Sequence, residues 1–140
     1  MTILISSCLL GQNCKYNGGN NYNAELNDFL RNGNHTVISV CPETLGGLPI
    51  PRPPAEIVGG IVTNREGVCV DNEFRHGAKK ALEIALTNKV DLAILQSRSP
   101  SCGVGHIYDG TFSKTLINGN GIFAEMLIQN GIPVKDVADL

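Results

Sequence analysis

The sequence contains no tryptophan, only 5% aromatic and 17% charged residues, and no pair of cysteines with Cys-x2-Cys spacing. The missing pair argues against a zinc ribbon and against a bacterial ferredoxin motif, because both need that local spacing. The formal net charge of -2 provides no basic field for gripping a long nucleic acid, although a local pocket for one phosphate is compatible with it. A small-molecule partner is therefore favoured over a long nucleic acid.

The beginning of the chain also lacks a basic leader and a long apolar run. Its first apolar stretch is interrupted by Ser6 and Ser7, whereas a signal peptide or a membrane span needs a longer one. We therefore expect a cytoplasmic protein without a membrane partner. The chain has five cysteines, and in a reducing compartment such cysteines are expected to be ligands or nucleophiles rather than disulfide partners.

Short apolar runs alternate with helical patterns along the chain. Strands are expected at 2–6, 36–40, 91–96 and 133–137, and helices at 24–32, 72–88 and 121–129, with Asn23 and Asp71 as N-caps of the first two. This alternation predicts an α/β fold, a three-layer αβα, Rossmann-like parallel sheet of about four strands, in a single domain spanning residues 1–140.

The remaining segments are expected to be loops and one small β-hairpin. Residues 61–63 and 68–70 flank the turn 64–67 and predict the hairpin, which would leave Cys69 outside the site and in the core. Residues 45–54 contain two glycines and four prolines, so they can form neither the interior of a helix nor a central strand. The segments 11–21, 45–54 and 105–110 are therefore expected to be irregular.

Three cysteines follow predicted strands. Cys8 and Cys41 come shortly after the first and second strands, and Cys102 lies in the loop after the third. Because the carboxyl ends of parallel strands meet at one edge of the sheet, these thiols are expected to converge there. Thiolates that lie so close repel one another unless a cation shares them. Three protein ligands leave a fourth position open, which is what binding a substrate atom requires.

Other interpretations of the cysteines stay open. Free cysteines are often small buried hydrophobes, and this is the default for Cys14 and Cys69, although Cys14 lies six residues beyond Cys8 and could assist or substitute at the site. The same three thiols could serve a nonenzymatic iron-sulfur or zinc sensor. A plain cysteine hydrolase is disfavoured because no histidine is assigned beside a candidate thiol, and His106 is expected to be a loop residue.

An ordered set of motifs then points to a family. The motifs are Ser6-Ser7-Cys8-Leu9-Leu10-Gly11, Tyr16-Asn17-Gly18-Gly19, Cys41-Pro42-Glu43, Gly47-Leu48-Pro49, Pro51-Arg52 and Ser97-Arg98-Ser99-Pro100-Ser101-Cys102-Gly103. With them the chain resembles the thiouracil desulfidase family from its first strand to about Glu125. The resemblance implies a [4Fe-4S] cluster held by three cysteine ligands, Cys8, Cys41 and Cys102, with one open iron. It also implies catalytic roles for Glu43 and Ser101.

The resemblance implies an enzyme that removes sulfur from 2- or 4-thiouracil, or from a 4-thiouridine nucleotide, to give the oxo compound and hydrogen sulfide without net redox chemistry. We expect Glu43 to activate water, and Ser101 to bind the ring carbonyl or position that water. The substrate is expected to contact Lys15, Arg52, Arg98 and Ser99, with the cations gripping a nucleotide phosphate. Alternatively, Glu43 caps a helix or pairs with Arg98, Ser101 closes a turn, and the arginines form structural ion pairs.

Overall fold

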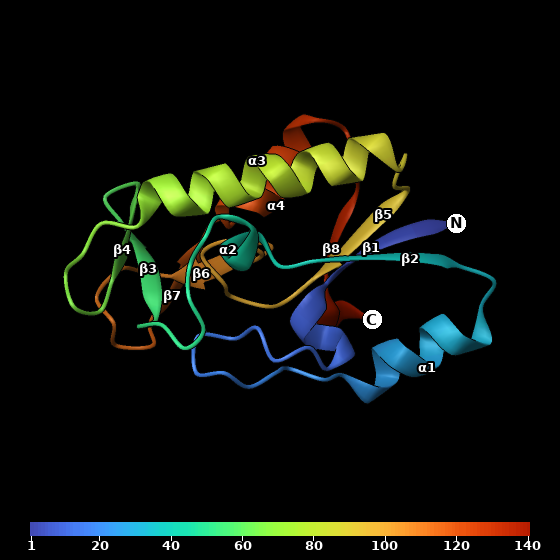
Figure 1. Cartoon of the computed structure of the whole chain (residues 1–140), viewed down its shortest axis with the longest axis horizontal. Helices are drawn as coiled ribbons and strands as arrows, with labels where there is room; N and C mark the ends of the chain where they lie inside the picture. The colour runs from blue at the N-terminus through green and yellow to red at the C-terminus, as the bar shows by residue number, and fades with distance from the viewer.

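A parallel four-stranded sheet with the order β2-β1-β5-β8 forms the centre of the molecule (Figure 1). The structure is a computed structural model that describes all residues, 1–140. The strands are β1 (Thr2–Ser6), β2 (Thr36–Val40), β5 (Leu92–Leu95) and β8 (Val134–Asp136). Because every strand pair in this sheet is parallel, all four carboxyl ends lie at the same edge, as predicted.

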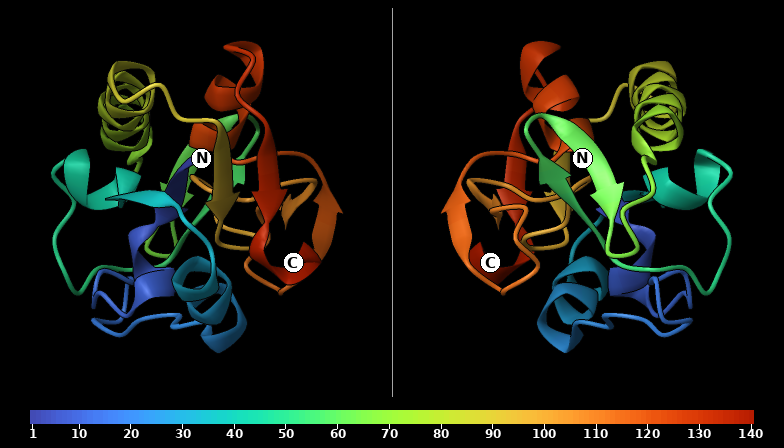
Figure 2. Two further views of the ribbon diagram at one scale, coloured as in Figure 1. Left: turned by 90° about the vertical axis from the view of Figure 1, so that its right-hand side faces the viewer. Right: turned by 90° about the vertical axis from the view of Figure 1, so that its left-hand side faces the viewer.

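Helices cover both faces of the sheet (Figure 2), which confirms the three-layer α/β fold. The helix α1 (Ala24–Asn32) lies on one face, and α3 (Asp71–Thr87) and α4 (Ile122–Gln129) lie on the other. Strand β1 is buried on both faces because its side chains alternate: Ile3 and Ile5 pack with Leu26 of α1, whereas Leu4 packs with the residues of α3 and α4. This alternation produces two separate hydrophobic clusters.

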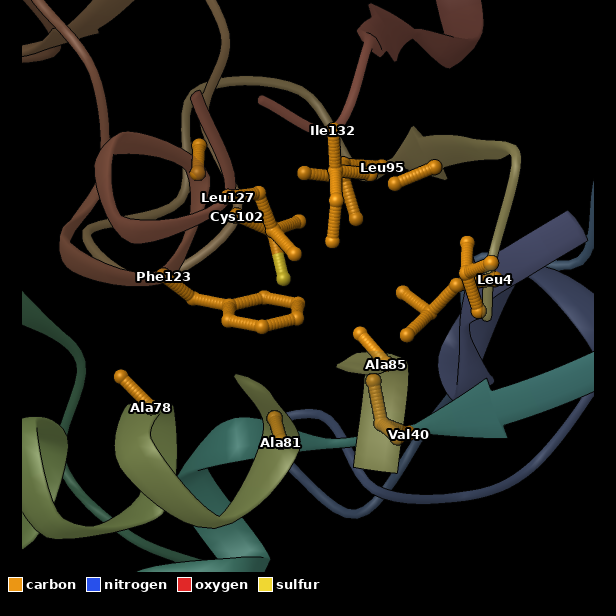
Figure 3. Packing of buried hydrophobic residues seen from close by; sticks show 13 residues of the cluster. Leu4, Val40, Ala78, Ala81, Ala85, Leu95, Cys102, Phe123, Leu127 and Ile132 are labelled. Atoms are coloured by element: carbon orange, nitrogen blue, oxygen red, sulfur yellow. The ribbon is translucent and has the colours of Figure 1, made fainter. Parts of the chain in front are cut away.

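Small side chains on α3 bring it close to α4. Figure 3 shows the ring of Phe123 from α4 beside Cys102 and among the alanines of α3, including Ala78 and Ala81, and all of these residues belong to the larger cluster. Both alanines and Phe123 have no exposed surface. No helix in the structure combines the length and the apolar character needed to cross a membrane.

The two predicted helix caps have different outcomes. Asn23 caps α1 as expected, since its Oδ1 accepts a hydrogen bond of 2.9 Å from the Leu26 amide. The prediction that Asp71 caps α3 is wrong. Asp71 is the first residue of α3, and its carboxylate accepts hydrogen bonds from Val62 and Arg75 instead. Partial burial raises the pKa of Asp71, but these two partners lower it more, so the pKa lies below its ordinary value. Asp71 thus joins α3 to the preceding hairpin.

The strand β4 of the predicted hairpin has a partner strand that the sequence analysis did not predict. Strand β3 (Ala55–Val58) pairs antiparallel with β4 (Ile61–Asn64) across a two-residue turn, Gly59-Gly60, in which both glycines have positive φ. Residues 68–70 also pair with β4, as predicted, through an antiparallel bridge between Cys69 and Thr63 and two backbone hydrogen bonds of 2.9 Å, but they do not form a continuous strand. Cys69 is exposed, so the expectation that the core holds it is wrong, while its position outside the site agrees with the prediction.

Three short elements lie outside the predicted helices and strands. They are α2 (Pro42–Leu45) and the antiparallel pair β6 (His106–Tyr108) and β7 (Leu116–Asn118). Each is too short to show a hydrophobic period, so tertiary packing rather than local sequence fixes it. Single 3-10 turns, η1 (Ser7–Leu10) and η2 (Val137–Asp139), follow β1 and β8.

Candidate functional site

A cavity of about 320 Å³ lies at the carboxyl edge of the sheet, where β1, β2 and β5 end. Its lining includes every residue that the sequence analysis selected, namely Cys8, Cys41, Cys102, Glu43, Ser101, Lys15, Arg52, Arg98 and Ser99. Residues from segments far apart in the chain therefore meet at one site, as the strand-end argument predicts. The cavity also has lining residues that the sequence analysis did not select.

Cys8 is held by the turn that follows β1. It lies in η1, and its carbonyl oxygen accepts hydrogen bonds from the amides of Gly11 and Asn21, at 3.2 and 3.0 Å. The Asn21 side chain donates to the Cys8 sulfur over 3.5 Å. The returning loop therefore fixes both the backbone and the sulfur of Cys8.

Cys41 is positioned by a close contact between two helices. It is the N-cap residue of α2, and α2 packs against α3 at two glycines. A Cβ atom on Gly77 would lie 1.8 Å from the carbonyl oxygen of Pro42, and a Cβ atom on Gly46 would lie 1.9 Å from that of Glu73. Only glycine permits this approach, so the contact sets the position of Cys41 and of the following helical turn.

Cys102 is held by a loop that folds onto the beginning of α4. The Ser101 carbonyl oxygen accepts hydrogen bonds from the amides of Phe123 and Ala124, at 2.9 and 3.1 Å. The Ser99 hydroxyl accepts hydrogen bonds from the amides of Ser101 and Cys102, at 3.1 and 3.0 Å. Cys102 is 4% exposed, and burial raises the pKa of its thiol to about 12.

A fourth thiol, that of Cys14, also lines the cavity, and the Cys41 thiol lies 3.9 Å from the Cys14 carbonyl oxygen. The neighbouring Cys41 and Cys8 thiols raise the pKa of the Cys14 thiol. The Cys14 thiol in turn lowers the pKa of Cys8 to about 7 and the pKa of Cys41 to about 5. The default expectation of a merely structural Cys14 overlooks this place in the lining, whereas the alternative drawn from its spacing to Cys8, that it could reach the site, agrees with it.

Glu43 lies at the centre of a polar network beside the thiols. Its carboxylate accepts a 2.9 Å hydrogen bond from the Ser101 hydroxyl and pairs with Arg52 over 3.1 Å. The Arg52 guanidinium also donates to the carbonyl oxygens of Cys14 and Pro49, at 2.8 and 3.2 Å. Burial raises the pKa of Glu43, although Arg52 and Ser101 partly oppose this effect. The ion pair considered with Arg98 is thus formed with Arg52 instead.

Two further cations and three aromatic rings line the cavity without having been predicted as site residues. Arg65 and Lys114 join the three predicted cations, and Arg65 lies over the ring of Phe112 with 5.9 Å to its centroid. Tyr16 and Tyr108 provide the other two rings. The lining holds five Lys or Arg residues and two Glu residues, so the cavity is locally positive in a chain of net charge -2. No local run of basic and aromatic residues indicates this lining, because its residues come from separate turns.

The backbone is strained in the same region. Four residues other than glycine have positive φ, and Arg98, Phe112 and Lys114 are three of them. All three line the cavity. Such strain persists only where the surrounding structure enforces it, and it is concentrated at functional sites.

Comparison with known proteins identifies the family. The model of the family described as 2-thiouracil desulfurase matches residues 3–139. The chain belongs to the 2-thiouracil desulfurase family. The expected relationship is thereby confirmed over nearly the whole chain.

Two relatives of this desulfurase family member match it over nearly their whole lengths. The first, "Uncharacterized protein YbbK" from Bacillus subtilis (strain 168), is 38% identical over 142 residues, which cover 94% of this chain and 93% of YbbK. The second is a solved structure, the [4Fe-4S]-dependent thiouracil desulfidase TudS. It superposes with a TM-score of 0.90 at 38% identity and covers 99% of this chain and 92% of its own.

The thiols of this desulfurase family member suit a cluster better than a single metal ion. No group of three or more His, Cys, Asp or Glu side chains converges closely enough to hold one ion. Sulfurs around one zinc ion stand only about 3.8 Å apart, given a Zn–S bond of about 2.3 Å and tetrahedral angles. An iron-sulfur cluster is larger and is held by cysteine thiolates, so its ligands stand farther apart around one cavity. Cys8, Cys41 and Cys102 line one cavity and supply the cysteine donors that such a group needs.

Proposed function

We propose that the protein is a [4Fe-4S]-dependent desulfidase that hydrolyses the carbon–sulfur double bond of a thiolated uracil. Water replaces sulfur, the products are the oxo pyrimidine and hydrogen sulfide, and no electron is transferred in the net reaction. The observation that carries this proposal is the convergence of three strand-end cysteines, Glu43 and Ser101 on one cavity in a member of this family. The dependence of TudS on a [4Fe-4S] cluster supports the cofactor assignment.

We assign Cys8, Cys41 and Cys102 as the cluster ligands. They line the same cavity, and the loop and helix contacts around them hold their backbones in place. A cluster held by these three ligands would keep one iron open, and that iron would act as a Lewis acid toward the thiocarbonyl sulfur and make the ring carbon more electrophilic. The low pKa of the Cys41 thiol favours the thiolate form that an iron ligand needs.

Glu43 and Ser101 are the proposed catalytic residues. Burial raises the pKa of Glu43, which makes its carboxylate a better base toward water. The Ser101 hydroxyl donates to this carboxylate over 2.9 Å, so the two groups can pass one proton between them. In this proposal Glu43 takes the proton from the attacking water, and Ser101 orients either that water or the ring carbonyl.

The polar partners of this pair fix its geometry. Arg52 contacts the Glu43 carboxylate and two backbone carbonyls, so its guanidinium is already engaged. The Ser99 hydroxyl lies 2.9 Å from the Ser101 hydroxyl and also accepts from two amides. Arg52 and Ser99 were expected to contact the substrate. We propose that they act mainly by orienting the catalytic residues Glu43 and Ser101.

The other lining residues suit a pyrimidine that carries a phosphate. The rings of Tyr108 and Phe112 offer faces for a planar base. Lys15 and Arg98, the remaining predicted substrate contacts, combine with Arg65 and Lys114 to make the cavity positive. Arginine suits the geometry of phosphate oxygens. We propose that this positive lining favours a 4-thiouridine nucleotide over the free thiouracils.

The test is anaerobic reconstitution with iron and sulfide, followed by turnover assays with 2-thiouracil, 4-thiouracil and 4-thiouridine 5′-monophosphate. We expect a brown protein that releases one hydrogen sulfide for each oxo pyrimidine formed, without an added reductant. A brown protein that leaves all three compounds intact would instead support a nonenzymatic iron-sulfur sensor. A colourless protein with tightly bound zinc would rule out the cluster.

A further inference from the structure

Cys14 is a fourth thiol at a site for which the proposed function needs only three. It is 8% exposed and lines the cavity together with Cys8, Cys41 and Cys102. Its carbonyl oxygen lies 3.9 Å from the Cys41 sulfur, so the Cys14 residue stands directly beside one of the proposed ligands. Cys69, the fifth cysteine, is exposed and outside the cavity, so the clustering of the other four is not a general property of the cysteines in this chain.

The loop that carries Cys14 is tied to the site from both sides. The Cys14 carbonyl oxygen accepts a hydrogen bond of 2.8 Å from Arg52 Nη2, and it lies 3.9 Å from the Cys41 sulfur. Two residues further on, the Tyr16 carbonyl oxygen accepts a 2.7 Å hydrogen bond from the Arg52 amide. These contacts hold the Cys14 backbone beside the thiols, so only the side chain needs to turn for its sulfur to reach a bound cluster.

We propose that Cys14 is an exchangeable fourth ligand of the cluster, which binds the iron left open by Cys8, Cys41 and Cys102 until a thiolated substrate displaces it. In the exchange, the iron–sulfur bond to Cys14 breaks as the bond to the substrate sulfur forms. The Cys14 thiolate takes one proton from the medium, and no electron is transferred. This inference rests on the proposed function, because it requires the cluster.

The first test measures how easily the open iron is lost. The reconstituted protein is oxidised anaerobically with ferricyanide, and the EPR signal of the resulting [3Fe-4S] cluster and the released iron are followed over time. Wild type, C14S, C14A and C69S are compared. We expect C14S and C14A to lose one iron at least about tenfold faster than wild type, since a missing partner at a metal site typically costs this much. C69S is expected to behave as wild type.

The two substitutions of Cys14 separate a ligand from a hydrogen-bond donor. Serine keeps a hydroxyl that can donate to the sulfurs of Cys8 and Cys41, but it is a poor ligand for iron. If C14S behaves as wild type and only C14A is faster, Cys14 merely donates hydrogen bonds and the ligand role is overturned. If C14S is folded by circular dichroism but takes up no cluster, Cys14 is an obligatory ligand and its exchange is overturned.

The second test measures the exchange itself. In the E43Q background, where turnover is slow, 2-thiouracil is titrated against the visible absorption of the cluster. Adding C14S should lower the apparent Kd several-fold, because the substrate then has no internal ligand to displace. An unchanged Kd would refute displacement. If wild type itself takes up no cluster, both this inference and the proposed function fail, whereas equal iron loss from wild type and C14S refutes the inference alone.

Discussion

The two edges of the central sheet are built differently. At the amino edge, the segments 33–35, 88–91 and 130–133 connect each helix to the next strand directly. At the carboxyl edge, long irregular segments connect each strand to the next helix and contain the additional short elements; they are 7–23, 41–70 and 96–121. Every residue that lines the cavity comes from the carboxyl edge or from the strand ends beside it, and none comes from the three amino-edge segments.

This difference teaches where the chain tolerates irregular backbone. The amino-edge turns mainly complete backbone hydrogen bonds, such as those of Thr36 to Met1 and of Asp91 to Thr2. The carboxyl-edge loops instead hold four thiols, a carboxylate network and several cations around one cavity. Substitutions at the carboxyl edge should therefore change chemistry, whereas those at the amino edge should change stability alone.

The largest effect is expected from replacing a proposed cluster ligand. C41S or C102S should abolish desulfidase activity and leave the reconstituted protein with little of the wild-type iron and sulfide content, because each of these thiols is the proposed permanent ligand of one iron. C69S, which removes an exposed thiol away from the cavity, is the matched control and should keep both. Wild-type iron content in C41S or C102S would show that the ligands have been misassigned.

Next comes Glu43. E43Q should lower kcat by about 10²- to 10⁴-fold, the range for losing a general base, while the iron content stays at the wild-type level. The control is E66Q, which changes an exposed acid in the turn after β4. A substantial kcat in E43Q would move the proton transfer to another group.

A smaller loss is expected at Arg52, which orients Glu43 through a planar guanidinium. R52K keeps the charge but loses the fork geometry, so kcat should fall by about 10- to 100-fold, as for other supporting partners of a metal site. Steady-state kinetics with free thiouracil and with the nucleotide check this. A raised KM for the nucleotide alone, with kcat intact, would instead make Arg52 a phosphate contact.

The contact between α2 and α3 links stability to chemistry. G77A should destabilise the protein by about 1 to 3 kcal/mol, because the added methyl group collides with the carbonyl of Pro42. It should also lower kcat, because α2 carries Glu43 and begins at Cys41. K79G, at an exposed position of the same helix, should cost about 1 kcal/mol through helix propensity without moving α2, and should keep activity. Equal activities in both variants would refute this coupling.

The smallest effect is expected at the amino edge. Asp91 Oδ2 accepts a 2.7 Å hydrogen bond from the Thr2 amide at an exposed position. D91A should cost less than about 1 kcal/mol in the free energy of unfolding, measured by urea denaturation. Its kcat and KM should match those of wild type. A clear loss of activity would refute the claim that substitutions at the amino edge change stability alone.

The sequence was sufficient for the layers of the fold and for the edge that carries the site. Apolar runs bounded by turn residues located β1, β2 and β5, and a cysteine follows each of them. It was less informative about short elements such as α2, β6 and β7, since a few residues show no period. It also missed β3, which pairs with β4 across the turn Gly59-Gly60, while the predicted pairing of 61–63 with 68–70 is present as a bridge.

Cys14 and Cys69 mark the limit of sequence reasoning. The same default interpretation applies to both, yet one thiol lines the cavity with the proposed ligands and the other faces solvent. Similarly, no spacing links Arg52 to Glu43, or brings Arg65 and Lys114 to the cavity. These pairings depend on how irregular loops fold back over the sheet.

Local residue patterns by themselves determined the main strands, the main helices and the sheet edge at which three cysteines lie. The reason is that hydrophobic periodicity and strand direction depend on residues close together in the sequence. The family relationship could also be read from the ordered motifs. Only the tertiary structure decided which charges pair, which cysteine joins the other three, and how closely α2 approaches α3. Such contacts join residues from distant segments, and their distances depend on the packing of the whole chain.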